Sequence, residues 1–68
     1  MKYTVVFEKT STGYSAYVPD LPGCITTGKT KEETERNMAE ALHGHIALMR
    51  EEGLPIPEPT TEAERISA

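Results

Sequence analysis

The stretch CITTGKTKEETERNMAEAL, Cys24 to Leu42, carries the transition from strand to helix that decides the fold. Its first part, Cys24–Gly28, is a short β-branched run typical of a strand. Thr30 and Glu33 then stand at the spacing of a capping box, in which each side chain satisfies a backbone N–H left unpaired at a helix N-terminus. Apolar residues recur every three or four positions beyond this point. We therefore predict a helix from about Lys31 to Glu52.

The preceding part of the chain has the pattern of a β-hairpin. Apolar and polar residues alternate from Met1 to Glu8, which predicts a strand with one buried face. The polar segment Lys9–Gly13 ends in a glycine that can adopt a positive φ, so it suits a hairpin loop. Alternation resumes over Tyr14–Val18, which predicts a second strand antiparallel to the first.

These elements predict one α+β domain over residues 1–68. We expect an antiparallel sheet of three or four strands in βββα(β) order, with the long helix packed on one face. Gly53 is placed to end the helix in a left-handed conformation. The proline-rich segment from Leu54 to Pro59 must then run extended, because each proline restricts the residue before it. For the rest of the tail, 60–68, a short helix capped by Thr61, a final edge strand and a disordered end all fit the sequence.

Length and composition limit the cellular setting. A core in a chain of 68 residues supplies only about 3–5 kcal/mol, so small domains add disulfides, metals or partner chains. The single cysteine, Cys24, cannot form an internal disulfide, and no segment resembles an apolar leader or a membrane span. We expect a cytoplasmic protein that does not insert into membranes and that gains stability as a homo-oligomer.

Charge limits the class of partner. The net charge of −4 opposes the clustered Lys and Arg that phosphate binding requires, so direct DNA binding is not expected. An acidic surface instead favours encounter with a basic protein.

The residues that carry chemistry do not form a catalytic set. His43 and His45 lie about 200° apart around a helix, so they do not converge on one metal. Cys24 begins an apolar strand, where a buried structural thiol is common. Asp20 is the only aspartate, whereas two-metal phosphoryl chemistry needs several convergent carboxylates. We predict that the chain is not an enzyme and has no cofactor.

The segment VPDLPGC, Val18 to Cys24, has two interpretations. It fits simple turn chemistry, with Pro19 ending a strand and Gly23 relieving backbone strain. It also fits a recognition surface, because a rigid and partly apolar loop loses little entropy on binding. The partner-binding residues that this second interpretation predicts are Tyr17, Asp20, Leu21 and Pro22.

The run GYSAYVPDLPGCITTGKTKEETERNMAEAL resembles the N-terminal domain of the HicB antitoxin family, together with the opening strand YTVVFEK and the closing GLPIPEP. The resemblance covers nearly the whole chain. It implies a partial ribonuclease H-like fold, in which AERIS, Ala63–Ser67, is an edge strand. It also implies binding of HicA, a small basic ribonuclease toxin, so that the toxin's catalytic surface is blocked. Thr34 departs from the family pattern, because alanine is common there.

The resemblance does not extend to DNA binding. Many HicB proteins carry a C-terminal ribbon-helix-helix or helix-turn-helix segment, and we expect no such operator-binding segment here. The leading hypothesis is a stand-alone HicB-like antitoxin that neutralises a HicA-type toxin by occlusion. The alternatives are a degenerate ribonuclease H-like enzyme acting on nucleic acid and an orphan oligomeric scaffold without a toxin.

Overall fold

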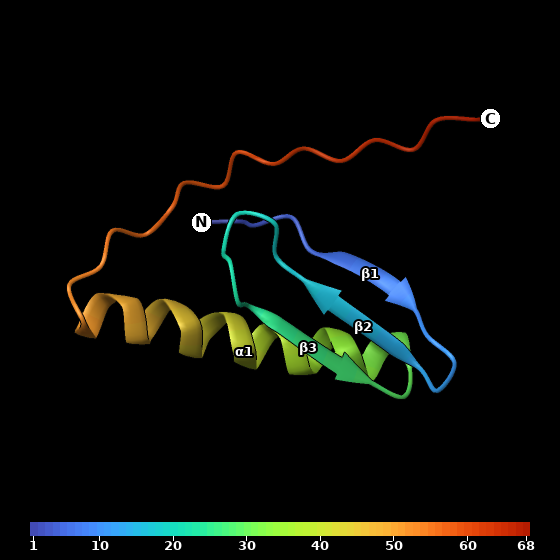
Figure 1. Cartoon of the computed structure of the whole chain (residues 1–68), viewed down its shortest axis with the longest axis horizontal. Coiled ribbons are helices and arrows are strands. Elements are labelled where there is room, and N and C mark those ends of the chain that lie inside the picture. Colours follow the sequence, from blue (N-terminus) through green and yellow to red (C-terminus); the bar gives the residue numbers. More distant parts are fainter.

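The computed structural model describes all of residues 1–68 and contains three strands followed by one helix. The strands are β1 (Val6–Lys9), β2 (Tyr14–Tyr17) and β3 (Ile25–Gly28), and they form an antiparallel sheet in the order β1-β2-β3. The helix α1 spans Lys31–Glu51 and lies along one face of this sheet (Figure 1). The predicted α+β class, the βββα order and the helix on one face are confirmed.

The first strand is shorter than the sequence pattern predicted. The prediction began it at Met1, whereas β1 begins at Val6, which pairs with Tyr17 at the end of β2. Beyond Tyr17 the chain turns into a loop, where the Val18 N–H bonds to the Cys24 carbonyl and Pro19 has no N–H. No strand is therefore available to pair with the residues before Val6.

Both ends of the helix follow from local signals, although only one of the two bonds of the predicted capping box forms, since the Glu33 side chain makes no hydrogen bond with the Thr30 N–H. The Thr30 hydroxyl accepts a hydrogen bond from the Glu33 N–H at 3.1 Å, which satisfies one of the unpaired donors of the first turn. At the other end Gly53 has a φ of 68°, and its N–H donates to the Arg50 carbonyl at 3.1 Å. The helix is thus fixed by its own caps.

The hydrophobic core lies between the sheet and the first half of α1. Its fully buried apolar residues come from β2, the loop after it and the helix: Ala16, Val18, Leu21, Cys24 and Met38. Half-buried residues of the N-terminal segment and the later helical turns surround this cluster. The last turns of α1 project past the sheet (Figure 1), so the second half of the helix is less covered than the first.

The helix N-terminus approaches β3 closely at Thr34 and Gly28. The Thr34 side chain is fully buried, and its hydroxyl donates to the Thr30 carbonyl at 2.7 Å, so its polar atom is satisfied. A Cβ on Gly28 would lie 2.8 Å from the Thr34 backbone nitrogen. Gly13 is needed for a similar reason, because a Cβ there would meet the Gly28 carbonyl oxygen. The φ of Gly13 is not positive, so the hairpin loop does not use the left-handed conformation that glycine allows.

Gly28→Ala is expected to destabilise the fold by about 1–3 kcal/mol, because the added methyl overpacks the junction between β3 and α1. Gly44→Ala is the matched control, since no atom lies within 4 Å of a Cβ at that helical position. That control should be stabilising by up to about 1 kcal/mol, from helix propensity. Urea unfolding of the two variants at equal protein concentration measures the difference, and equal effects would contradict the role assigned to Gly28.

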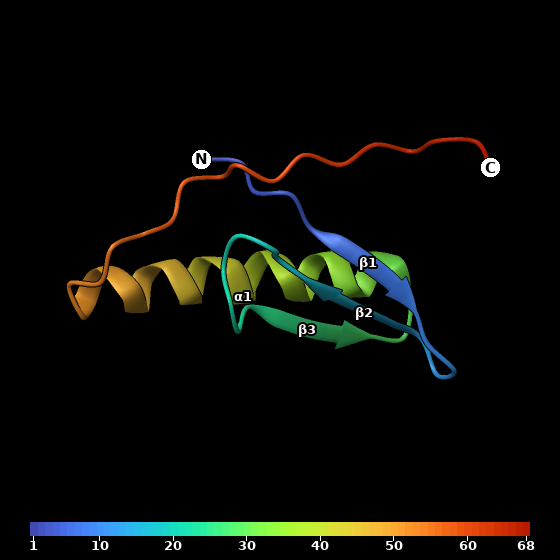
Figure 2. The same ribbon diagram turned by 45° about the horizontal axis from the view of Figure 1, so that its top comes forward.

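The C-terminal tail is extended and forms neither helix nor strand. Its first part is attached to the N-terminal segment by side chains: the Tyr3 hydroxyl donates to the Pro57 carbonyl at 2.6 Å, and the Thr4 hydroxyl donates to the Thr61 carbonyl at 2.8 Å. Figures 1 and 2 show the tail continuing past this point, away from the sheet. The edge strand implied for Ala63–Ser67 does not form within the chain, because this segment has no backbone hydrogen bond to β1.

Candidate partner-binding surface

The loop Val18–Cys24 is held by three backbone hydrogen bonds within itself. The Leu21 N–H donates to the Val18 carbonyl at 3.0 Å, and the Cys24 N–H donates to the Leu21 carbonyl at 3.1 Å, giving two consecutive turns. Pro22 and Gly23 occupy the centre of the second turn, where the Gly23 φ of 86° is typical of a type II turn. The Val18 N–H closes the loop on the Cys24 carbonyl at 3.1 Å. The loop is therefore rigid before any partner binds.

The spacing of residues in this loop separates a buried side from an exposed side. Val18, Leu21 and Cys24 stand three positions apart, and all three are buried in the core. Pro19 and Pro22 lie between them and are exposed. The core thus anchors the loop at three points while the two proline rings face solvent.

The sheet face opposite the helix carries an apolar row that ends at this loop. Val6, Tyr17 and Ile25 are direct cross-strand neighbours on β1, β2 and β3, so they lie side by side on one face. Tyr17 is 39% exposed and Ile25 is 64% exposed. A hollow of about 340 Å³ lies between these two side chains and the loop, and Pro19 and Pro22 help to line it.

We call this surface, made of Val6, Tyr17, Ile25, Pro19 and Pro22, the open-face site. Large apolar side chains beside a rigid loop are typical of a protein-binding surface rather than of a site for chemistry. The next row on the same face is polar and consists of Glu8, Ser15 and Thr27. Glu8 gives the edge of the site a negative charge.

The four residues predicted to bind a partner do not all lie on this surface. Tyr17 and Pro22 do, and their role in binding stays a prediction. Leu21 is only 1% exposed and belongs to the core, so its side chain is not presented to a partner. Asp20 faces the C-terminal tail instead. Ile25 was missed, although its position opposite the outward-facing Tyr17 would have placed it on the open face once the strand register was known.

Asp20 attaches the loop to the tail. Its carboxylate accepts hydrogen bonds from the Thr61 N–H at 3.0 Å, the Thr61 hydroxyl at 2.8 Å and the Thr60 hydroxyl at 3.1 Å. The Thr61 N–H, followed by the Thr61 hydroxyl, holds the pKa of Asp20 below its ordinary value, because these bonds favour the charged carboxylate. The loop and the tail are therefore connected through one ionised group.

The attachment through Asp20 is expected to be lost in acid. A carboxyl group whose pKa is lowered by folding stabilises the folded state above its unfolded pKa, about 3.9, and this stabilisation is lost as pH falls from there through the folded pKa. The Thr61 amide NMR signal should therefore titrate with a midpoint below about 3.9. The Thr34 amide, which donates to the Thr30 carbonyl, is the internal control. Asp20→Asn should abolish the titration, and a Thr61 signal that titrates unchanged in this variant would contradict the assignment.

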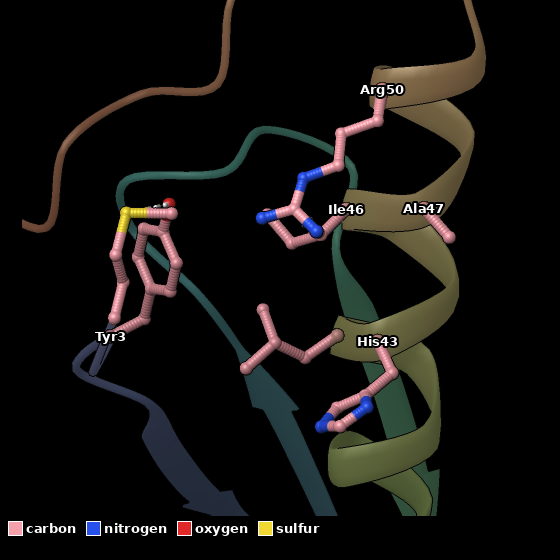
Figure 3. Close-up of a pocket in the computed structure, with 7 residues that line it drawn as sticks. Tyr3, His43, Ile46, Ala47 and Arg50 are labelled. Carbon is pink, nitrogen blue, oxygen red and sulfur yellow. Dashed lines mark hydrogen bonds between the residues drawn. The ribbon is translucent and has the colours of Figure 1, made fainter.

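A second hollow, of about 420 Å³, lies between the N-terminal segment and the later turns of α1. Figure 3 shows His43, Ile46 and Arg50 extending from the helix toward this hollow, with Tyr3 on its opposite side. Tyr3 is already engaged by the tail through the Pro57 carbonyl. His43 is exposed and His45 is partly buried, as the helix pattern predicted.

The groups that could support catalysis are separate from one another. Cys24 is buried, and loss of hydration raises the pKa of its thiol, so the protonated form dominates near neutral pH. No three His, Cys, Asp or Glu side chains are grouped so as to hold a metal ion. The one helix lacks a stretch both long and apolar enough to cross a membrane.

Comparison with known proteins places the chain in a family. The model for the HicB-like antitoxin of bacterial toxin–antitoxin systems matches residues 3–68. A UPF0150 protein of Thermoplasma acidophilum is 41% identical over an alignment that covers 100% of both chains. Antitoxin HicB 2 of Photorhabdus laumondii is 36% identical over 94% of this chain and 46% of its own length.

The fold is also similar to a solved structure. A chain of the HicA3 and HicB3 toxin–antitoxin complex superposes with a TM-score of 0.76 at 35% identity, covering 88% of this chain and 70% of that one. These matches define a small α+β domain of the kind found in antitoxins. The chain belongs to the HicB-like antitoxin family.

Proposed function

We propose that this chain is an antitoxin that binds a small basic HicA-type ribonuclease and neutralises it by covering its catalytic surface. Membership of the HicB-like antitoxin family supports the general role, and the similarity to a chain of a HicA–HicB complex supports the type of partner. The observation that carries the proposal is the open-face site, because it is apolar, exposed and rigid in the absence of a partner.

The physical properties of the site suit occlusion. A preformed loop loses little conformational entropy on binding, so more of its contact energy appears as affinity. The net charge of −4 would accelerate encounter with a basic protein. No catalytic group of the antitoxin takes part, because the mechanism requires only that the toxin's active site be blocked. We place this activity in the cytoplasm and assign it no direct DNA binding.

Self-association is the second part of the proposal. The helix leaves one face of the sheet and the outer edge of β1 uncovered, whereas Asn37 of α1 donates to the Thr27 carbonyl of β3 at 2.8 Å. An exposed strand edge favours pairing with another chain. We propose that the antitoxin is a homo-oligomer whose copies present separate open-face sites.

The experiment begins from the genes adjacent to the one for this chain, among which we expect one for a small basic protein. Purified toxin should bind the antitoxin at a fixed ratio in calorimetry, and its RNA cleavage should fall to background as that ratio is reached. Toxin that still cleaves RNA at saturating antitoxin would contradict occlusion. Absence of a neighbouring gene for a basic protein would contradict the assignment of a cognate toxin. RNA cleavage by the antitoxin alone, with magnesium or manganese present, would contradict a role without chemistry.

A further inference from the structure

The end of the tail is extended but has no partner within the chain. After Thr61 no residue takes part in a backbone or side-chain hydrogen bond, and Ile66 is 86% exposed. Figures 1 and 2 both show the tail running in the same direction as β1 and standing away from it. Residues 62–68 are thus held at their base, through Thr61, and free beyond it.

The monomer exposes more surface than a compact chain of its mass. A folded protein of 7.5 kDa is expected to expose about 4,200 Å², whereas this chain exposes 5305 Å². Its radius of gyration is 13.0 Å, compared with about 11 Å for a compact chain of this length. The excess, on the order of 1,000 Å², is similar to the roughly 800 Å² that each partner buries in a standard protein interface. The surplus therefore matches the area that one dimer interface would cover.

The outer edge of β1 is the free strand edge nearest to the tail, yet the chain's own tail makes no backbone hydrogen bond with it. Extending the alignment set by the bond between Thr4 and Thr61 would place Glu64 beside Phe7. Glu64 would then lie near Lys31, whose ammonium is 5.4 Å from the Phe7 ring centroid, and Arg65 would lie beside Glu8. The chain's own tail nevertheless makes no hydrogen bond with β1 beyond Thr61.

A tail from a second copy that runs antiparallel to β1 has one register in which its side chains complement those of β1. Opposite residues in an antiparallel pair have a constant sum of residue numbers, and the sum of 73 produces three favourable pairs at once. These pairs are Phe7 with Ile66, Glu8 with Arg65, and Lys9 with Glu64. One pair is apolar and lies on the core side, and the other two join opposite charges.

Symmetry permits both copies to make this contact together. Within one chain the tail and β1 run in the same direction (Figures 1 and 2). A two-fold axis perpendicular to the strands reverses that direction in the second copy. Each tail is then antiparallel to the other copy's β1, and the assembly closes as a dimer with an isologous interface.

We propose that two copies of this chain exchange their tails, with residues 62–68 of each forming a fourth strand on the outer edge of β1 of the other. This inference rests on the self-association part of the proposed function and names the segment that carries it. The contact leaves the open-face site uncovered, because the tail adds at the edge of the sheet and not on its face.

Charge reversal at one pair tests the register. Lys9→Glu and Glu64→Lys each place like charges opposite one another, twice in the symmetric dimer, and each should raise the dimer dissociation constant by about tenfold. The double variant restores opposite charges and should return the constant to within about threefold of the wild-type value. Sedimentation equilibrium of the full-length proteins measures all four constants.

Crosslinking separates exchange from folding back. Lys9→Cys combined with Glu64→Cys should form, on oxidation, a covalent dimer between chains labelled with different tags. Lys9→Cys combined with Ile66→Cys is the control, since it tests the register of the chain's own tail. Tail exchange would be contradicted if the dimer dissociation constant were unchanged by the charge reversals, or if the disulfide formed only within one chain. Neither result would contradict self-association. A wild-type chain that stays monomeric at high micromolar concentration would overturn both, whereas toxin binding is measured independently.

Discussion

Leu21→Ala is expected to leave a large part of the protein unfolded at 25 °C. Leu21 is the largest apolar side chain that is fully buried, and it enters the core from a loop whose backbone bonds hold it in place. Truncation of a buried leucine costs about 2–5 kcal/mol. The core of so small a domain supplies only about 3–5 kcal/mol in total, so this loss removes most of the stability.

The matched control is Leu48→Ala, because Leu48 is an exposed leucine on the helix. That substitution should change the free energy of unfolding by no more than about 0.5 kcal/mol. Urea unfolding followed by circular dichroism measures both variants. Protein concentration must be equal in all samples, since self-association would add to apparent stability. Similar losses in the two variants would contradict the position assigned to Leu21 in the core.

The buried position of Leu21 shows where sequence reasoning reaches its limit. The caps of the helix at Thr30 and Gly53 were predictable, because each depends on residues a few positions away. The start of β1 was not, since alternation continues to Met1 whereas the pairing partner ends at Tyr17. Likewise Gly13 was recognised as a turn residue, but the reason that it must lack a Cβ is its contact with Gly28, which is distant in the sequence.

The candidate site was predicted in part for the same reason. The segment Val18–Cys24 was identified as a rigid loop, and the structure confirms its turns. The direction of each side chain could not be predicted, because buried residues in this loop recur every three positions rather than every two. The partners of Asp20 lie 40 and 41 residues away in the tail, so no local pattern links them. Only the folded arrangement separates Asp20, which holds the tail, from Tyr17, which faces solvent.

This separation gives the loop two roles that variants can distinguish. Its buried side stabilises the fold through Leu21, and its exposed side contributes Pro22 to the open-face site. A substitution on the buried side affects binding only by unfolding the chain. Residues of the open face instead offer changes that leave the core intact, and Ile25, at 64%, is more exposed than Tyr17.

Ile25→Asp is expected to weaken binding of a HicA-type toxin by about thirtyfold or more, corresponding to about 2 kcal/mol, the cost typical of a hot-spot residue. The substitution would bury an unpaired carboxylate within the apolar row, beside Tyr17. Thr27→Asp is the control, because Thr27 lies on the same face of β3 and the change in charge is identical. Its effect should stay below about threefold, since polar residues at the rim of an interface contribute little.

Calorimetric titration of the toxin gives both affinities, and circular dichroism verifies that the two variants remain folded. A larger loss of affinity for Ile25→Asp than for Thr27→Asp would locate the interface at the apolar row, because Ile25 belongs to that row and Thr27 does not. Equal losses would instead mean that added negative charge, and not burial of Ile25, governs the affinity. Unchanged affinity of the Ile25→Asp variant would mean that the toxin binds another surface of the domain. In that case the apolar row and the rigid loop beside it would have no part in neutralisation.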